Sequence, residues 1–102
     1  MAEFTKQGTV AVTGTILHTG VERGVLSSVS KVMTIRVNNP VAYDFILSRY
    51  NAATATTVQL YELTLSAGDT LTDNLIYVLE AGDELIAYSN VVGTTYYVYG
   101  VE

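Results

Sequence analysis

The chain has 102 residues and a formal net charge of −5. Apolar residues make up 49% of it and charged residues only 15%, which excludes intrinsic disorder, because disordered chains are rich in charge and poor in apolar residues. Its apolar runs are far shorter than the ~18 residues that a membrane-spanning helix needs. We therefore expect one domain over residues 1–102, with no membrane span and with residues 1–8 as a flexible N-terminal arm.

The residue types favour strands over helices. Val, Thr, Tyr and Ile supply 41 of the 102 residues, and these β-branched and aromatic side chains fit a pleated sheet. Cysteine is absent, which excludes disulfides, thiol nucleophiles and thiolate metal sites. The N-terminal segment lacks the apolar stretch of a signal peptide, so we expect a chain made in the cytoplasm. The composition predicts an all-β fold.

The first clear periodicity runs from Thr9 to His18, where residues alternate in the manner of one strand. Its more apolar face is predicted to carry Val10, Val12, Gly14 and Ile16. A second strand is predicted over residues 29–38, with Val29, Met33, Ile35 and Val37 on one side. Asn38, Asn39 and Pro40 end it, because proline donates no ladder hydrogen bond and asparagine favours turns.

Residues 41–50 fit two patterns. A strand would alternate Val41, Tyr43, Phe45 and Leu47, whereas a short helix would be capped by Asn39 and begin at Pro40. We prefer the strand, because nothing else in the chain is helical. Residues 51–56 are small and predict a loop, and a further strand follows over residues 57–65.

A short repeat marks two turns in the last third of the chain. The segment Leu65–Leu71 matches Leu79–Leu85, and both contain Ala-Gly-Asp. Glycine permits a positive φ and aspartate can bond the backbone beside it, so Gly68, Asp69, Gly82 and Asp83 are predicted structural turn residues. Further strands are expected over residues 75–79, 85–89 and 94–101. Seven or eight short strands predict an antiparallel β-sandwich of the jelly-roll type.

The final strand is apolar on both faces, with Tyr97, Tyr99 and Val101 on one side and Tyr96 and Val98 on the other. A sandwich strand normally has one solvated face. We therefore predict that another chain covers one of these faces, with Tyr96, Tyr97, Val98 and Tyr99 as candidate interface residues. The alternative is a row of tyrosines packed under a loop.

The charges are unevenly distributed. The first 49 residues carry five cations and three acidic residues, a net charge of +2, whereas residues 50–102 carry seven acidic residues and no cation. This argues against a nucleic-acid partner, which requires a basic surface. Either the acidic half forms a solvated surface, or the two halves meet on neighbouring copies. The candidate charges for such an interface are Arg23, Lys31, Arg36, Arg49, Glu80, Asp83 and Glu84.

No motif predicts catalysis or cofactor binding. His18 is the single histidine, and none of the serines lies in a Gly-x-Ser-x-Gly turn. The acidic pairs Asp69/Asp73 and Asp83/Glu84 lie in predicted turns, where aspartate has a structural role. They also lack the pattern of a calcium-binding EF-hand loop. We expect no enzyme activity, no catalytic residue, no cofactor and no bound metal.

Four segments together resemble a known class of protein: Ile35–Asn39, Leu63–Thr70, Tyr77–Leu85 and Val98–Glu102. In this order they are similar to small β-sandwich virion proteins of tailed bacteriophages, and the resemblance covers residues 29–102. It implies a non-enzymatic particle component, present in many copies, made in the host cytoplasm and located in the virion. Its expected partners are the major capsid protein or other virion proteins.

Three functions remain open. The first is a capsid decoration (cement) protein that binds and stabilises the head, and the second is a tail, neck, baseplate or fibre accessory protein. The third is a carbohydrate-binding module that uses surface tyrosines for stacking. We expect a homo-oligomer and predict a trimer, because the final strand is apolar on both faces and decoration-type sandwiches often occupy three-fold positions.

Overall fold

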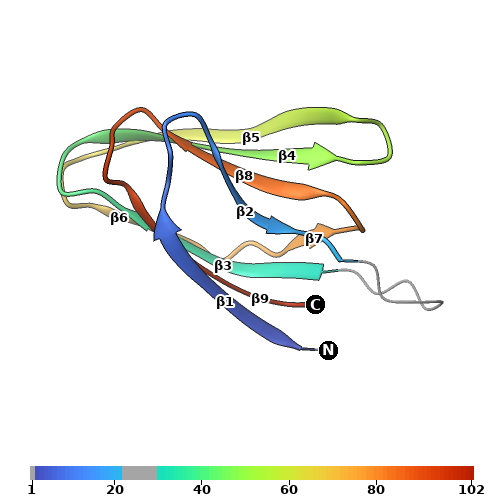
Figure 1. Ribbon diagram of the computed structural model, residues 1–102. Helices are drawn as coiled ribbons and strands as arrows, with labels where there is room; N and C mark the ends of the chain where they lie inside the picture. The colour runs from blue at the N-terminus through green and yellow to red at the C-terminus, as the bar shows by residue number, and fades with distance from the viewer. Residues whose placement is uncertain (1, 22–29) are drawn as a thin grey trace.

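A computed structural model describes residues 2–21 and 30–102, which form an all-β domain of two antiparallel sheets (Figure 1). The nine strands of the described residues are β1 (Glu3–Thr9), β2 (Thr15–Thr19), β3 (Ser30–Asn38), β4 (Tyr43–Asn51), β5 (Thr56–Leu65), β6 (Thr70–Asp73), β7 (Tyr77–Leu79), β8 (Glu84–Ser89) and β9 (Thr95–Val101). The all-β prediction is confirmed, with nine strands in place of seven or eight.

The strand order is that of a jelly roll. One sheet has the order β1-β9-β3-β6, with β7 also pairing with β3, and the other has the order β2-β8-β4-β5. Along the chain, β1, β2, β3 and β4 therefore lie in the two sheets by turns, and β8 and β9 again lie in different sheets. If β6 and β7 are taken as two parts of one strand, each sheet has the four strands of the eight-stranded jelly roll.

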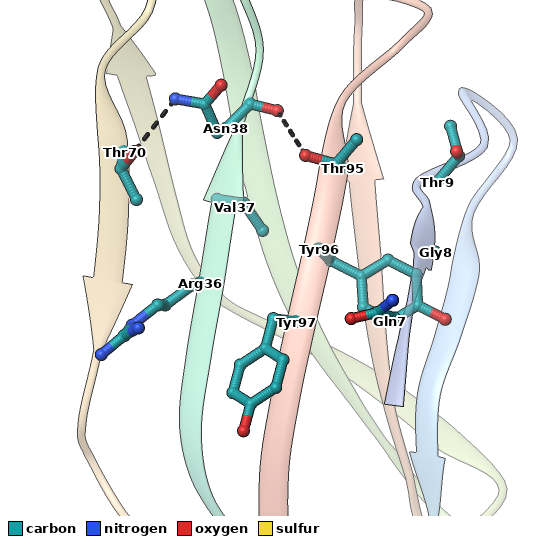
Figure 2. A pocket seen from close by; sticks show the side chains of 10 residues that line it. All are labelled: Gln7, Gly8, Thr9, Arg36, Val37, Asn38, Thr70, Thr95, Tyr96 and Tyr97. Atoms are coloured by element: carbon teal, nitrogen blue, oxygen red, sulfur yellow. Dashed lines mark hydrogen bonds between the residues drawn. The ribbon is translucent and has the colours of Figure 1, made fainter. Parts of the chain in front are cut away.

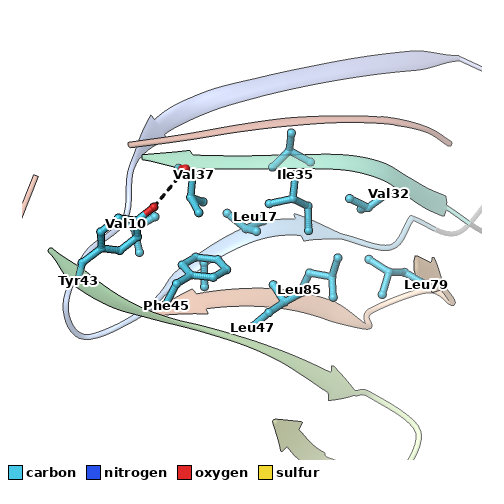
Figure 3. Close-up of a cluster of buried hydrophobic side chains, with 12 residues drawn as sticks. Val10, Leu17, Val32, Ile35, Val37, Tyr43, Phe45, Leu47, Leu79 and Leu85 are labelled. Carbon is cyan, nitrogen blue, oxygen red and sulfur yellow. Dashed lines mark hydrogen bonds between the residues drawn. The ribbon is translucent and has the colours of Figure 1, made fainter. Parts of the chain in front are cut away.

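The two sheets enclose one apolar core (Figure 3). Strand β4 contributes Tyr43, Phe45 and Leu47, which alternate along the strand and are at most 2% exposed. This pattern confirms the strand over residues 41–50 and excludes the helix. The Tyr43 hydroxyl also donates to the carbonyl of Val37, so its polar end is satisfied inside the core. The remaining core residues are Val10, Leu17, Val32, Ile35, Val37, Leu79, Leu85, Ala87 and Val98.

The predicted strand over residues 9–18 is wrong, because a turn divides it. Strand β1 ends at Thr9, and the Gly14 N–H donates to the carbonyl of Ala11. A β-bulge in β2 between Ile16 and His18 then directs Leu17 into the core, while Val12 and Ile16 are about half exposed. Of the face predicted to be more apolar, Val10 lies in the core, whereas Val12 and Ile16 face solvent.

Strand β3 also contains a bulge, between Val32 and Thr34. It leaves Ile35 and Val37 in the core as predicted, but places Val32 there instead of Met33. The predicted N-terminal arm needs correction as well. Residues 3–9 are not a free arm, since they pair with β9 along their whole length, from Glu3 opposite Val101 to Thr9 opposite Thr95. No helix in the described residues is long and apolar enough to cross a membrane.

Candidate functional site

The candidate site is the outer face of the sheet around β9, and it is made by neighbouring strands in register. Tyr97 lies between Gln7 of β1 and Arg36 of β3, and Tyr99 lies between Thr5 and Thr34 in the same way. Because opposite residues in an antiparallel pair share a face, these side chains project from one surface. We call it the tyrosine face, formed by Thr5, Gln7, Thr34, Arg36, Tyr97 and Tyr99.

The inward side of β9 explains why these tyrosines point outward. Val98 is fully buried in the core, and Gly100 lies directly against β1 and β3. A Cβ atom on Gly100 would collide with the carbonyl oxygen of Lys31 and with the ring of Phe4, so only glycine fits there. Tyr96 is half-buried, packs against the core and lies beside Gly8 (Figure 2). The interior of the domain therefore accounts for one of the two apolar sides of β9.

The tyrosine face is shallow and open. Thr34, Arg36, Tyr97 and Tyr99 line a hollow of about 380 Å³. A second hollow of about 490 Å³ adjoins it towards Thr9 and Thr70, and Figure 2 shows Tyr97 and Arg36 side by side along it. Such a surface suits contact with another macromolecule or a chain-like ligand better than enclosure of a small substrate.

One hydrogen bond orients the end of this face. The Tyr99 hydroxyl donates to Oε1 of Glu3 over 3.1 Å. This bond, with smaller effects of desolvation and of the Glu3 charge, raises the pKa of Tyr99 above its ordinary value. Tyr99 therefore remains a neutral donor at physiological pH.

The charges separate by sheet, which the sequence did not reveal. Lys31, opposite Val101, and Arg36, opposite Tyr97, lie on the outer side of the β9 sheet, together with Glu3, which accepts the hydrogen bond of Tyr99. The register of the other sheet places Asp44, Glu62 and Glu84 on its outer side, because Tyr43, Phe45 and Leu85 point inward. The predicted interface residue Arg23 lies outside the described residues. Among these residues, the cations outnumber the single acidic residue on the outer face of the β9 sheet, whereas the outer face of the other sheet carries only acidic residues.

Arg49 and Asp83 were predicted to contribute to contacts between copies, but the structure pairs them within one chain. Arg49 Nη2 lies 2.7 Å from Oδ2 of Asp83 and also donates to the carbonyl of Val78. Asp83 is only 3% exposed and accepts from the backbone N–H groups of Ala52 and Glu80. The Asp83 carboxylate therefore connects three parts of the chain: strand β4 through Arg49, the β4–β5 turn through Ala52, and the turn before β8 through Glu80.

The two Ala-Gly-Asp turns have the same backbone but different surroundings. Gly68 and Gly82 both have positive φ, 79° and 84°, as the repeat predicted. The aspartate N–H donates back three residues in each turn, to Ser66 and to Glu80. However, Asp69 is exposed whereas Asp83 is buried, so only the second turn is part of the interior.

Two polar clusters were missed from the sequence. The first centres on Asp73, which is 7% exposed and accepts hydrogen bonds from the hydroxyls of Tyr61 (2.7 Å) and Tyr77 (2.6 Å). Desolvation, followed by the bonds to Asp73, raises the pKa of both tyrosines well above the ordinary value. The cluster connects β5 with β6 and β7. No local sequence motif predicts it.

The second cluster surrounds His18, which is 3% exposed. Its ring stacks on Phe4 with the centroids 4.0 Å apart, its Nδ1 lies 2.8 Å from Nζ of Lys6, and its Nε2 lies 3.3 Å from a carboxylate oxygen of Glu102. Burial, and then the Lys6 charge, lower the pKa of His18, while Glu102 opposes them. A neutral His18 accepts a hydrogen bond from Lys6 and ties β1 to β2 across the open edge of the sandwich.

This cluster predicts a loss of stability in mild acid. The folded-state pKa of His18 lies below the unfolded value of 6.5, so the unfolded chain binds the proton first. The His18 contribution is complete above that value and is lost as the pH falls below it. We expect the free energy of unfolding, measured with urea, to decline between about pH 7.5 and 5.5. The variant His18→Gln should decline less, and an equal slope in both proteins would contradict this role.

The described residues contain no group of three His, Cys, Asp or Glu side chains placed to hold a metal ion. The serine-containing segment 27–28 lies outside the described part of the chain, and Ser30 is buried at the start of β3. The site therefore rests on the tyrosine face. No protein-family model, curated protein or solved structure matches the chain.

Proposed function

We propose that this protein is a non-enzymatic structural component of a bacteriophage virion that decorates the capsid by docking its tyrosine face on the major capsid protein. The observation that carries the proposal is the outward projection of Tyr97 and Tyr99 beside Arg36 on the two middle strands, β9 and β3, of their sheet. Tyrosine and arginine are the residues that most often dominate protein interfaces, because each combines a large packing surface with directed hydrogen bonds.

Two further arguments support this function. One of the four sequence segments that resemble phage virion proteins, Val98–Glu102, covers the end of β9 with Tyr99, and the jelly roll is an architecture of many viral capsid proteins. A tail, neck, baseplate or fibre position would use the same face against another virion protein, and images of labelled particles distinguish these positions from the head.

We test the docking face with particles that lack this chain. Purified wild-type protein should bind them, whereas the double variant Tyr97→Ala/Tyr99→Ala should bind at least about thirty-fold more weakly, because a central tyrosine contributes about 2 kcal/mol. The matched control is Tyr88→Ala, which makes the same change on the outer face of the other sheet. Equal binding by the double variant and the wild type, with both proteins folded, would refute this docking face.

A carbohydrate ligand is the second candidate, and one observation favours it. Tyr97 and Tyr99 lie two residues apart on one face beside the polar side chains of Gln7 and Arg36, which is the arrangement of a sugar-stacking platform. Lectins also include jelly rolls. Saturable binding on a glycan array that is lost in Tyr97→Ala would establish this function in place of capsid decoration.

A further inference from the structure

The four edges of the two sheets differ in how well they are protected against pairing. Strand β2 has five residues and a bulge, and β6 has four residues, so both are poor templates for another strand. Strand β1 directs Lys6 inward, opposite the buried Val98, and an inward-pointing charge is a recognised protection of an edge. Strand β5, on the edge of its sheet, is the exception.

Strand β5 is the longest strand described, with ten residues from Thr56 to Leu65. Among the described strands it pairs with β4 alone, on one side, and its sequence contains a single charged residue, Glu62, and no proline. It does carry one bulge, where Leu60 has no partner on β4. The five residues after the bulge, 61–65, form an uninterrupted ladder with β4 and leave an open row of backbone groups on the other side.

Apolar side chains gather along the same edge. Leu63 is 41% exposed although it lies on the core side of β5, and Leu75 is 66% exposed. Together with Tyr61 and Leu71 they line a groove of about 490 Å³ between the edges of the two sheets. The open backbone and the uncovered apolar groove are separate observations that point to one missing neighbour.

We propose that β5 pairs with β5 of a second copy of this chain in an antiparallel arrangement, which joins the two four-stranded sheets into one. The register that centres on Leu63 places Tyr61 opposite Leu65 and Glu62 opposite Thr64. It therefore avoids the unfavourable like-charge pair that the register centred on Glu62 would create. The two-fold axis is perpendicular to the sheet, because directly opposite residues share a face.

This symmetry also accounts for the groove. The inner sides of both copies lie on the same side of the joined sheet, so the two Leu63 side chains meet and the two grooves face each other. Leu71 and Leu75 of both copies then border one shared apolar layer. The contact is isologous and closed, so it yields a dimer and leaves the tyrosine face free. It stands independently of capsid docking.

The test is the mass of the protein in solution by light scattering over a concentration series. We expect the wild type to reach twice the chain mass of 11.0 kDa, and Leu63→Lys to remain a monomer. The control Val58→Lys places the same charge on the same strand, at a residue that is 60% exposed, pairs with Arg49 of β4 and lies outside residues 61–65, and this variant should still dimerise. Circular dichroism shows that each variant is folded.

A charge exchange tests the register itself. In Thr64→Glu, Glu62 of each copy lies opposite the new glutamate of the other copy, and these two like-charge pairs should weaken the dimer several-fold. Adding Glu62→Lys turns both into pairs of opposite charge and should restore the dimer. A wild type that is monomeric at every concentration, or a dimer that Leu63→Lys leaves intact, would overturn the proposal. So would a mass of three chains, the state predicted from the sequence, that persists in Leu63→Lys.

Discussion

Replacing Asp83 with alanine is expected to destabilise the protein by about 3 kcal/mol. The substitution removes the acceptor of Arg49 and leaves the N–H groups of Ala52 and Glu80 without their bonds in a buried turn. The expected loss is below that for a fully buried ion pair, because the Arg49 side chain is one third exposed. Urea denaturation of both proteins measures the difference.

The repeat supplies a matched control for this variant. Asp69→Ala makes the same change in the other Ala-Gly-Asp turn, which has the same backbone but an exposed aspartate, and should cost much less than 1 kcal/mol. If both variants lost the same stability, the effect would come from the turn backbone, and the network around Asp83 would have no special role.

Replacing Phe45 with alanine is expected to cost about 3–5 kcal/mol, the largest effect of any single substitution considered for this domain. Phe45 is fully buried between the sheets, and its ring centroid lies 6.3 Å from that of Tyr61. A cavity at this position would remove apolar contacts from the middle of the core and would loosen the inner side of β5.

Phe4 is the matched comparison, because the chain contains only two phenylalanines. Phe4 is half-buried at the edge of the sandwich and stacks on His18, so Phe4→Ala should cost about half as much. Thermal unfolding followed by circular dichroism ranks the two variants. A Phe4 variant less stable than the Phe45 variant would mean that the His18 edge, and not the centre of the sandwich, governs folding stability.

The fold was predictable where the pattern was strong. The abundance of β-branched and aromatic residues predicted strands, and the alternation of Tyr43, Phe45 and Leu47 predicted β4 correctly. The alternation predicted a single strand over residues 9–18, which was wrong, because the residues of the turn between Ala11 and Gly14 happen to continue the same alternating pattern. It failed again where bulges exchange faces, as at Val32 and Met33, since an extra residue in one strand leaves no mark in the pattern.

The candidate site was predictable in part. Strand alternation placed Tyr97 and Tyr99 on one face and Val98 on the other, as the structure does. The partner of Arg49 was not predictable, because Asp83 lies 34 residues away and only the turn beside β4 brings it close. The separation of charge between the two outer faces also depends on register, and a count of charges along the chain cannot show it.

The jelly roll relates the two proposed surfaces to each other. The tyrosine face belongs to the sheet that contains β9, whereas the β5 edge belongs to the other sheet, so the two surfaces do not compete (Figure 1). A protein that docks through one sheet and pairs through the edge of the other would link neighbouring sites on a particle. Such a link between neighbouring sites is the role that we propose for this protein on the capsid.

The most direct test of capsid decoration is the composition of virus particles from a culture that carries the gene. Particles purified on a density gradient should contain the chain in many copies, and antibody labelling should place it on the head surface. Particles from a strain without the gene should lack that label and regain it when wild-type protein, but not Tyr97→Ala/Tyr99→Ala, is added. A chain found only in the soluble fraction, with particles of unchanged composition after deletion, would contradict the account.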